Sequence, residues 1–326
     1  MTTDPDADTR LLAAIRGSRR VLLTGPEGPD GDSIGACLAL QRILAVVAPQ
    51  VEVQVAGDPG YRYLFLPGAA GMVRDDLVQE ADGIVILDGD RRRVPAPIAA
   101  LLGRARWVGL VDHHRSTDIA AYDVAVFDAA ADSTCGMVYG MGRRWGAPLD
   151  QDLAALLYAG IIFDTGGFRY TNTTAETHGV AAALLETGFD HAGVMLKVLV
   201  ERRPQAIRLL AGLLADTEML AGERVAMATC TRARLDAIGA IDADIEGVVD
   251  QLQHIVGVEL AAVLLEKAGG RVKVSLRSRG AVDVSRLAHA LHDGGGGHAK
   301  AAGVVLTGDT EAIAARLRAA LADALV

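Results

Sequence analysis

The sequence predicts an α/β protein of two domains, a parallel sheet wrapped by helices followed by a smaller second α/β domain. The length of 326 residues exceeds the roughly 100–200 residues that are usual for one domain. Short β-branched runs alternate with helical patterns in the first half of the chain, which is typical of a parallel sheet. A second alternating region begins near residue 222, after a long helical stretch, and this indicates the second domain.

Five runs rich in Val, Ile and Leu predict the strands of the first sheet: 20–25, 51–57, 83–90, 107–114 and 122–128. We expect a helix after the first run, beginning near Asp32 or Ser33, because both residues are good N-caps. The turn before this helix would lie at the carboxyl end of a strand. Open α/β sheets bind ligands at that edge.

The pattern becomes helical from residue 149, and helices are expected over 149–164, 174–188 and most of 190–217. The second alternating region begins with a strand at 222–230 and continues with a hairpin over 258–278 that turns near Gly269 and Gly270. A last helix is expected at 309–326. We therefore predict a first domain, a helical linker and a second domain over residues 1–190, 191–217 and 218–326.

Composition limits the classes of partner and compartment. The net charge of −9 argues against binding of long duplex nucleic acid, which requires many phosphates to be neutralised, but leaves room for a local basic pocket. No run approaches the roughly 18 uninterrupted apolar residues of a membrane span. Cys37, Cys135 and Cys230 have no close spacing, which excludes a zinc ribbon and a disulfide framework. These features predict a cytoplasmic protein.

Carboxylates and imidazoles occur where predicted strands or helices end: Asp30, Asp32, Asp88, Asp112, His113, His114 and Asp164. A single carboxylate at such a position is more often a helix cap or turn former. Because parallel strands bring their carboxyl ends to one edge, the whole set instead predicts a divalent cation site. Carboxylates with one or two imidazoles suit Mn²⁺, Mg²⁺ or Fe²⁺.

Six segments in order carry a resemblance to a known family. "PDGDSIG" (29–35), "ILDGD" (86–90), "VDHH" (111–114) and "FDTGGFRYTNTT" (163–174) resemble the motifs of the DHH phosphoesterase superfamily. "KVSLRS" (273–278) and "GGGGHAKAAG" (294–303) resemble its DHH-associated C-terminal domain. The combination is most similar to the oligoribonuclease and 3'-phosphoadenosine-5'-phosphate phosphatase branch, called NrnA-like or nanoRNase.

The resemblance implies a centre of two Mn²⁺ ions bridged by Asp88. Asp30 would bind the first ion, and the second would be held by Asp32, His113 and Asp164. Two ions about 3.5–4 Å apart can activate water near neutral pH and clamp phosphoryl oxygens during in-line attack.

The resemblance also implies which residues carry the chemistry: Asp88, Asp112, His113 and His114. Asp112 would orient the imidazoles rather than bind metal. His114 would contact substrate phosphate or assist at the first ion. Thr117 stands where the DHH motif usually continues to an asparagine, a mild change because threonine can still form a hydrogen bond.

The first motif departs from the family pattern at Pro26. Most of this branch has a metal-binding histidine there, and proline cannot coordinate a cation through its side chain. Either the first site is weak and relies on Asp30, Asp88, water and substrate phosphate, or Glu27 replaces the missing ligand. A third alternative is a protein that binds nucleotides without hydrolysing them.

In the second domain we expect a substrate-binding set: Arg277, Gly295, Gly296, Gly297 and His298. Glycines allow backbone N–H groups to approach an anion, and an arginine on a strand can grip a terminal phosphate through two N–H groups. The alternatives are a flexible turn for the glycine run and an ion pair on an edge strand for Arg277.

These observations predict a metal-dependent phosphoesterase. It would hydrolyse very short oligonucleotides such as pApA to nucleoside 5'-monophosphates, or 3'-phosphoadenosine 5'-phosphate to AMP. The alternatives are a cyclic-dinucleotide phosphodiesterase, a polyphosphate or pyrophosphate hydrolase, and the non-hydrolysing binder. A homodimer is left open, because dimers are the commonest closed assemblies.

Overall fold

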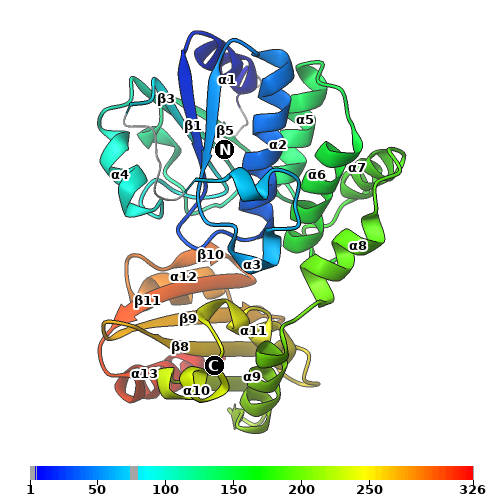
Figure 1. The fold of residues 1–326 in the computed structure, drawn as a ribbon. Helices are drawn as coiled ribbons and strands as arrows, with labels where there is room; N and C mark the ends of the chain where they lie inside the picture. Colours follow the sequence, from blue (N-terminus) through cyan, green and yellow to red (C-terminus); the bar gives the residue numbers. More distant parts are fainter. Residues whose placement is uncertain (1–3, 5, 74–79, 326) are drawn as a thin grey trace. The chain divides into compact units, whose positions relative to one another are not determined.

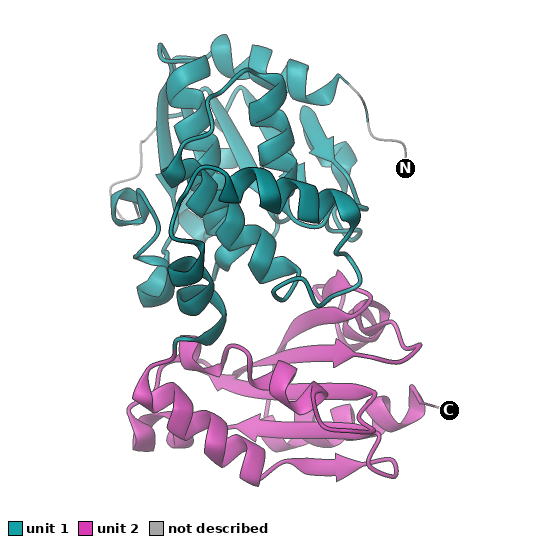
Figure 2. Ribbon diagram, turned by 90° about the vertical axis from the view of Figure 1, so that its right-hand side faces the viewer, with its two compact units in different colours: residues 1–201 teal, residues 202–326 magenta. Residues whose placement is uncertain are grey.

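The computed structural model describes residues 4, 6–73 and 80–325. The chain divides into two compact units, Met1–Glu201 and Arg202–Val326, which Figure 2 shows in different colours. The predicted helical linker 191–217 is therefore shared between the units: α8 (His191–Met195) and the π-helix η3 (Leu196–Val200) belong to the first, and α9 (Pro204–Ala215) to the second.

The first unit is built on a five-stranded sheet in the order β2-β1-β3-β4-β5, with every pair of neighbours parallel, as predicted (Figure 1). The strands are β1 (Arg20–Thr24), β2 (Glu52–Ala56), β3 (Gly83–Leu87), β4 (Trp107–Asp112) and β5 (Val124–Phe127). The helices are α1 (Ala7–Arg16), α2 (Gly31–Val47), α3 (Gly60–Tyr63), α4 (Ala96–Leu102), α5 (Thr134–Arg144), α6 (Gln151–Asp164) and α7 (Ala175–Leu185), with 3₁₀ turns η1 (Ala69–Gly71) and η2 (Ile119–Ala121).

Helices cover both faces of this sheet, which explains the continuous apolar strands. On one face Leu23 and Val85 belong to a core shared with α2, α5 and α6. On the other face Leu22 and Ile84 pack with Ile98 of α4. Both faces of the central strands β1, β3 and β4 are thus buried. The polar residues that follow these strands lie at the carboxyl edge of the sheet.

The second unit contains a six-stranded mixed sheet in the order β10-β11-β9-β8-β7-β6, in which only β7 and β8 pair in parallel among the described residues. Its strands are β6 (Glu218–Leu220), β7 (Val225–Cys230), β8 (Leu260–Lys267), β9 (Arg271–Ser278), β10 (Gly296–His298) and β11 (Ala301–Thr307). Its further helices are α10 (Arg232–Ile238), α11 (Val248–Gln253), α12 (Val284–Leu291) and α13 (Thr310–Asp323), with the 3₁₀ turn η4 (Asp242–Ile245). The two-domain α/β prediction is confirmed.

Two local expectations can be compared with the structure. The hairpin of β8 and β9 turns at Gly269 and Gly270, with φ of 74° and 68°, as expected. Helix α2 begins at Gly31, one residue before Asp32, so its expected start is confirmed, but neither Asp32 nor Ser33 is the cap, because the N-cap is Asp30. Its Oδ1 accepts hydrogen bonds from the backbone N–H groups of Asp32 and Ser33, both at 3.1 Å. The described helices are all too short or too polar to span a membrane.

Candidate metal centre

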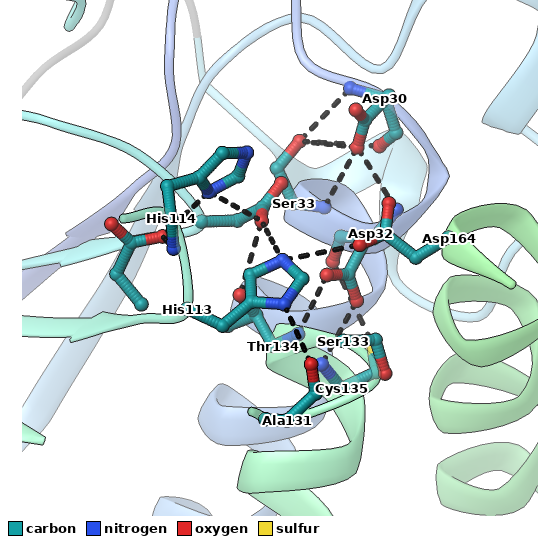
Figure 3. A network of polar contacts seen from close by, with 12 residues as sticks. Asp30, Asp32, Ser33, His113, His114, Ala131, Ser133, Thr134, Cys135 and Asp164 are labelled. Atoms are coloured by element: carbon teal, nitrogen blue, oxygen red, sulfur yellow. Dashed lines mark hydrogen bonds and ion pairs between the residues drawn. The ribbon is translucent and has the colours of Figure 1, made fainter. Parts of the chain in front are cut away.

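The structure gathers the predicted acidic and imidazole residues of the first unit at the carboxyl edge of its sheet. Asp32, His113 and Asp164 form one cluster, in which one ligand atom of each lies within 4.8 Å of the others (Figure 3). Asp32 comes from the first turn of α2, His113 follows β4, and Asp164 is the last residue of α6. Three segments distant in the sequence therefore meet at one point.

A second cluster of the same kind joins Asp88, Asp112 and His114. Asp88 follows β3 and has a φ of 59°, in the left-handed region that aspartate adopts more readily than most residues. Its Oδ1 lies 3.6 Å from Nε2 of His113 and 3.8 Å from Nδ1 of His114. Asp88 thus connects the two clusters.

A hydrogen bond fixes the imidazole tautomer of His113. Its Nδ1 lies 3.2 Å from the carbonyl oxygen of Ala131, which can only accept, so Nδ1 carries the proton. Nε2 then faces Oδ2 of Asp164 at 3.1 Å and Oδ1 of Asp88 at 3.6 Å. Two carboxylate oxygens that face one imidazole nitrogen need a positive charge between them. A proton on Nε2 supplies it in the metal-free protein, and a divalent cation bound by Nε2 would take the place of that proton, so the residues fit a divalent cation.

The crowding of carboxylates changes their proton affinity. Burial, and then repulsion from Asp164, raises the pKa of Asp32 to about 7 and also raises that of Asp30. Burial and repulsion from Asp32 raise the pKa of Asp88 well above its ordinary value. Burial lowers the pKa of His113, but its contacts with Asp164 and Asp88 outweigh this and raise it. A cation would relieve this repulsion.

Asp112 is set apart from these carboxylates by its hydrogen bonds. Burial raises its pKa, but donation by His114 and Thr117 outweighs burial, and the pKa falls below its ordinary value. Nδ1 of His114 lies 2.8 Å from Oδ1 of Asp112, and the hydroxyl of Thr117 donates to Oδ2. The hydrogen bond expected of Thr117 is therefore present, and Asp112 contacts His114 as an orienting residue does.

The sequence interpretation missed the segment Ala131–Cys135, here called the orienting segment, which leads into α5. The carbonyl of Ala131 binds His113, as described above. The backbone N–H of Thr134 donates to Oδ2 of Asp32 at 2.7 Å, and that of Cys135 donates to Oδ1 at 2.8 Å. Both carboxylate oxygens of Asp32 are therefore bound by the first turn of α5 (Figure 3). "DST" before a helical pattern signals an N-cap, but nothing in it indicates these distant partners.

Two further residues that sequence reasoning missed help to assemble the centre. Nδ2 of Asn172 donates to the carbonyl oxygens of Asp132 and Asp164, at 2.8 and 3.1 Å, and so ties the end of α6 to the orienting segment. A Cβ added at Gly160 of α6 would lie 2.5 Å from Oδ1 of Asp32. Gly160 therefore leaves the space that Asp32 occupies.

The structure places Pro26 and Glu27 beside the centre but in neither cluster. Pro26 is buried, and its Cβ lies 3.4 Å from the position of a Cβ on Gly89, next to Asp88. Glu27 has an exposed side chain, and its backbone N–H donates to the carbonyl of Arg93 at 2.6 Å. Neither of the two clusters gains a ligand from these residues.

The predicted substrate residues lie in the second unit. Arg277 of β9 is opposite Ala301 of β11, which is opposite His298 of β10. Residues directly opposite in antiparallel strands share one sheet face, so Arg277 and His298 lie on the same face with a small alanine between them. Strand β9 lies inside the sheet rather than at its edge, and Nε of Arg277 donates to Oδ1 of Asp250 in α11 at 2.7 Å.

The glycine run has a packing role in addition to any role in binding. A Cβ on Gly295 would lie 2.2 Å from the carbonyl oxygen of Ala288 in α12. Gly297 has a φ of 136°, and a Cβ there would lie 2.5 Å from the carbonyl oxygen of Ala301. With Gly296, these glycines allow β10 to pair with β11 and to lie close to α12. Gly296 and Gly297 thus lie in strand β10, whereas Gly294 and Gly295 precede it.

Family models match both parts of the chain. Residues 20–161 match the N-terminal domain of the DHH family, and residues 224–324 match the DHHA1 domain. The first match covers Asp30, Asp32, Asp88 and the two histidines, and the second covers Arg277 and His298.

Similar proteins cover nearly the whole chain. A bifunctional oligoribonuclease and PAP phosphatase NrnA of Thermus thermophilus is 31% identical over 302 residues, 91% of this chain and 87% of that protein. The protein of the same name from Bacillus subtilis is 26% identical over 90% of this chain and 92% of its own length. The crystal structure of an exopolyphosphatase-related protein from Bacteroides fragilis has a TM-score of 0.85, with 24% identity, over 98% of this chain and 96% of that one. The similarity to the Bacteroides fragilis structure shows that the fold is shared.

Proposed function

The chain belongs to the DHH family, in the branch with a C-terminal DHHA1 domain, and from this premise we propose that it hydrolyses very short oligonucleotides and 3'-phosphoadenosine 5'-phosphate. The names of the relatives, bifunctional oligoribonuclease and PAP phosphatase, support both substrates. The observation that carries the chemistry is the cluster of Asp32, His113 and Asp164, linked through His113 to Asp88. A phosphoesterase of this kind needs divalent cations, for which Mn²⁺ is our first choice.

The residues present fit two cation positions. Asp32, His113 and Asp164 would hold one cation. Asp30 lies in neither cluster but would hold the other cation, and Asp88, whose Oδ1 lies 3.6 Å from Nε2 of His113, would contribute to both. Bound divalent cations supply a nucleophile from water near neutral pH and charge that stabilises the phosphoryl oxygens. The protein contributes orientation, because the backbone carbonyl of Ala131 and the first turn of α5 fix His113 and Asp32 before any cation arrives.

His114 is proposed to contact the scissile phosphate. Its ring is held by Asp112, which accepts from Nδ1 at 2.8 Å, so Nε2 is directed away from that carboxylate. Arg277 and His298 share one face of the second unit's sheet and would bind the substrate's far end. A guanidinium and an imidazole on one sheet face suit a terminal phosphate, which accepts charge-assisted hydrogen bonds. The buried free thiols Cys37, Cys135 and Cys230 favour a reducing, cytoplasmic location.

A substrate panel tests the proposal. The protein is freed of metal with a chelator, reloaded with Mn²⁺, Mg²⁺ or Fe²⁺, and incubated with pApA, 3'-phosphoadenosine 5'-phosphate, cyclic di-AMP and pyrophosphate. We expect AMP from pApA and inorganic phosphate from 3'-phosphoadenosine 5'-phosphate, with most activity in Mn²⁺. Binding of pApA without turnover under all three metals would overturn the proposal in favour of a nucleotide-binding protein.

A further inference from the structure

Thr134 touches two carboxylates of the metal centre at once. It is the first residue of α5 and is fully buried. Its backbone N–H donates to Oδ2 of Asp32 at 2.7 Å, and its hydroxyl donates to Oδ1 of Asp88 at 3.0 Å. Asp32 lies in the first turn of α2, whereas Asp88 follows β3. One residue therefore links carboxylates from two separate elements.

Among the side-chain contacts described for Oδ1 of Asp88, the one with the Thr134 hydroxyl is the shortest, at 3.0 Å. The imidazole nitrogens of His113 and His114 lie 3.6 and 3.8 Å from the same oxygen, beyond ordinary hydrogen-bond length. The hydroxyl of Thr134 therefore makes the hydrogen bond that orients the carboxylate of Asp88. This contact comes from a rigid helix terminus.

The two contacts of Thr134 can be separated chemically. The backbone N–H that binds Asp32 is present whatever the side chain, whereas the contact with Asp88 needs a hydroxyl. Valine has almost the same shape as threonine without the donor, and serine keeps the donor without the methyl group. Helix capping is also separable, because the cap of α5 is Ser133, whose Oγ accepts from the backbone N–H of Gly136 at 3.0 Å.

We propose that Thr134 is a positioning residue that sets the Asp88 carboxylate relative to Asp32 so that both cations can bind together. The inference rests on the proposed metal centre. Loss of the hydroxyl would leave Asp88 able to turn away from the shared position, so that the weaker of the two ions is lost first. Outer contacts that orient metal ligands typically change metal affinity about 10- to 100-fold.

Isothermal titration of Mn²⁺ into chelator-treated full-length protein tests this inference, with thermal unfolding of the metal-free proteins measured alongside. We expect Thr134→Val to lower the affinity of the weaker ion about 10- to 100-fold. Thr134→Ser should restore affinity to within a few-fold of wild type. Thr217→Val is the matched control, because it removes a threonine hydroxyl that donates to the carbonyl oxygen of Leu213 at 2.9 Å, outside both clusters, and should leave both Mn²⁺ affinities unchanged.

The possible results separate this inference from the proposed function. If wild type binds no Mn²⁺, the metal centre itself is wrong. If wild type binds two ions and Thr134→Val binds them equally well, or if Thr134→Ser is as impaired as Thr134→Val, the positioning role is overturned. Should Thr134→Val fail to fold, Thr134→Ala takes its place as the variant without a hydroxyl, and two Mn²⁺ affinities equal to those of wild type in that variant contradict the inference.

Discussion

The ring of His113 and the carbonyl of Ala131 are joined by a hydrogen bond of 3.2 Å, which presents Nε2 of the imidazole to the carboxylates of Asp164 and Asp88. Ala131 precedes α5, and the first turn of that helix binds both oxygens of Asp32. The orientation of His113 and that of Asp32 are therefore set by neighbouring parts of one short segment. His113 and Asp32 are therefore held in place without a cation. We expect substitutions at the candidate ligands to lower metal affinity and activity strongly.

Replacing Asp88 by alanine should abolish hydrolysis while leaving the protein folded. A carboxylate shared by two cations cannot be replaced by water at both, so turnover of pApA with saturating Mn²⁺ should fall below about 1% of wild type. Circular dichroism and thermal unfolding check the fold. Asp90→Ala is the control, because Asp90 is also buried after β3 but pairs with Arg92 rather than with the clusters. Substantial turnover in Asp88→Ala would refute its bridging role.

The proposed cation position of Asp30 and Asp88 should bind Mn²⁺ more weakly than the position of Asp32, His113 and Asp164. Pro26 is buried beside Gly89 and offers no ligand, so an imidazole introduced there would lie close to Asp88. We expect two unequal Mn²⁺ affinities in wild type, and Pro26→His should tighten the weaker ion and lower the Mn²⁺ concentration for half-maximal turnover. Titration calorimetry and a Mn²⁺ dependence of activity measure both effects.

The rival explanation assigns the missing ligand to Glu27, although its side chain is exposed. In that case Glu27→Ala would lose metal and activity, and Pro26→His would change little. Two equally tight ions that respond to neither substitution would contradict both explanations and indicate a further ligand.

Sequence patterns locate candidate metal ligands better than they locate the groups that orient them. Asp30, Asp32 and Asp88 could be located because parallel strands end at one edge, and the structure places all three there. The contact between Thr134 and Asp88 could not, because it joins residues 46 apart in sequence whose pairing depends on how α5 packs against the sheet. Local propensity indicates that a helix begins near Thr134 but gives no information on which carboxylate its first turn meets.

Local sequence patterns also could not identify the N-cap of α2 or the hydrogen-bond partner of Arg277. Asp30, Asp32 and Ser33 are all acceptable caps, so composition could not select Asp30. The alternation of "VKVSLRS" correctly indicates a strand from which Arg277 projects, on the face opposite to Leu276. It could not indicate whether that strand is central or whether Asp250 of α11 lies within hydrogen-bond distance, because both depend on tertiary packing.

Arg277→Ala and His298→Ala should each weaken substrate binding much more than metal binding. Loss of a charge-assisted contact with phosphate costs about 1.5–3 kcal/mol, or a rise in KM of about 10- to 100-fold. Steady-state kinetics with pApA and Mn²⁺ titrations check the two halves of this prediction. Arg279→Ala is the control, because Arg279 follows the same strand but is exposed and donates to the carbonyl of Gln253. An unchanged KM for both pApA and 3'-phosphoadenosine 5'-phosphate in both variants would exclude this face as the substrate site.

The raised pKa of Asp88 predicts how stability depends on pH without metal. The folded protein keeps a proton on Asp88 that the unfolded chain loses above about pH 4, so the free energy of unfolding falls as pH rises through that range. Asp88→Asn removes this loss and can keep the hydrogen bond from Thr134. In the presence of a chelator, the stability of the variant relative to wild type should therefore increase as the pH is raised from 5 to 8.

Two comparisons make this result specific. Asp112 has a lowered pKa, so Asp112→Asn should show the opposite sign: its loss of stability relative to wild type is present at neutral pH and disappears as pH falls below the ordinary carboxyl pKa of about 4, through the lowered pKa. Saturating Mn²⁺ should make wild type more stable than Asp88→Asn at pH 8. A ligand that binds only the folded state stabilises it, and the variant lacks one of the proposed Mn²⁺ ligands. Urea denaturation at each pH measures all three proteins. Parallel pH profiles for wild type and Asp88→Asn in chelator would show that Asp88 is already ionised in the metal-free fold.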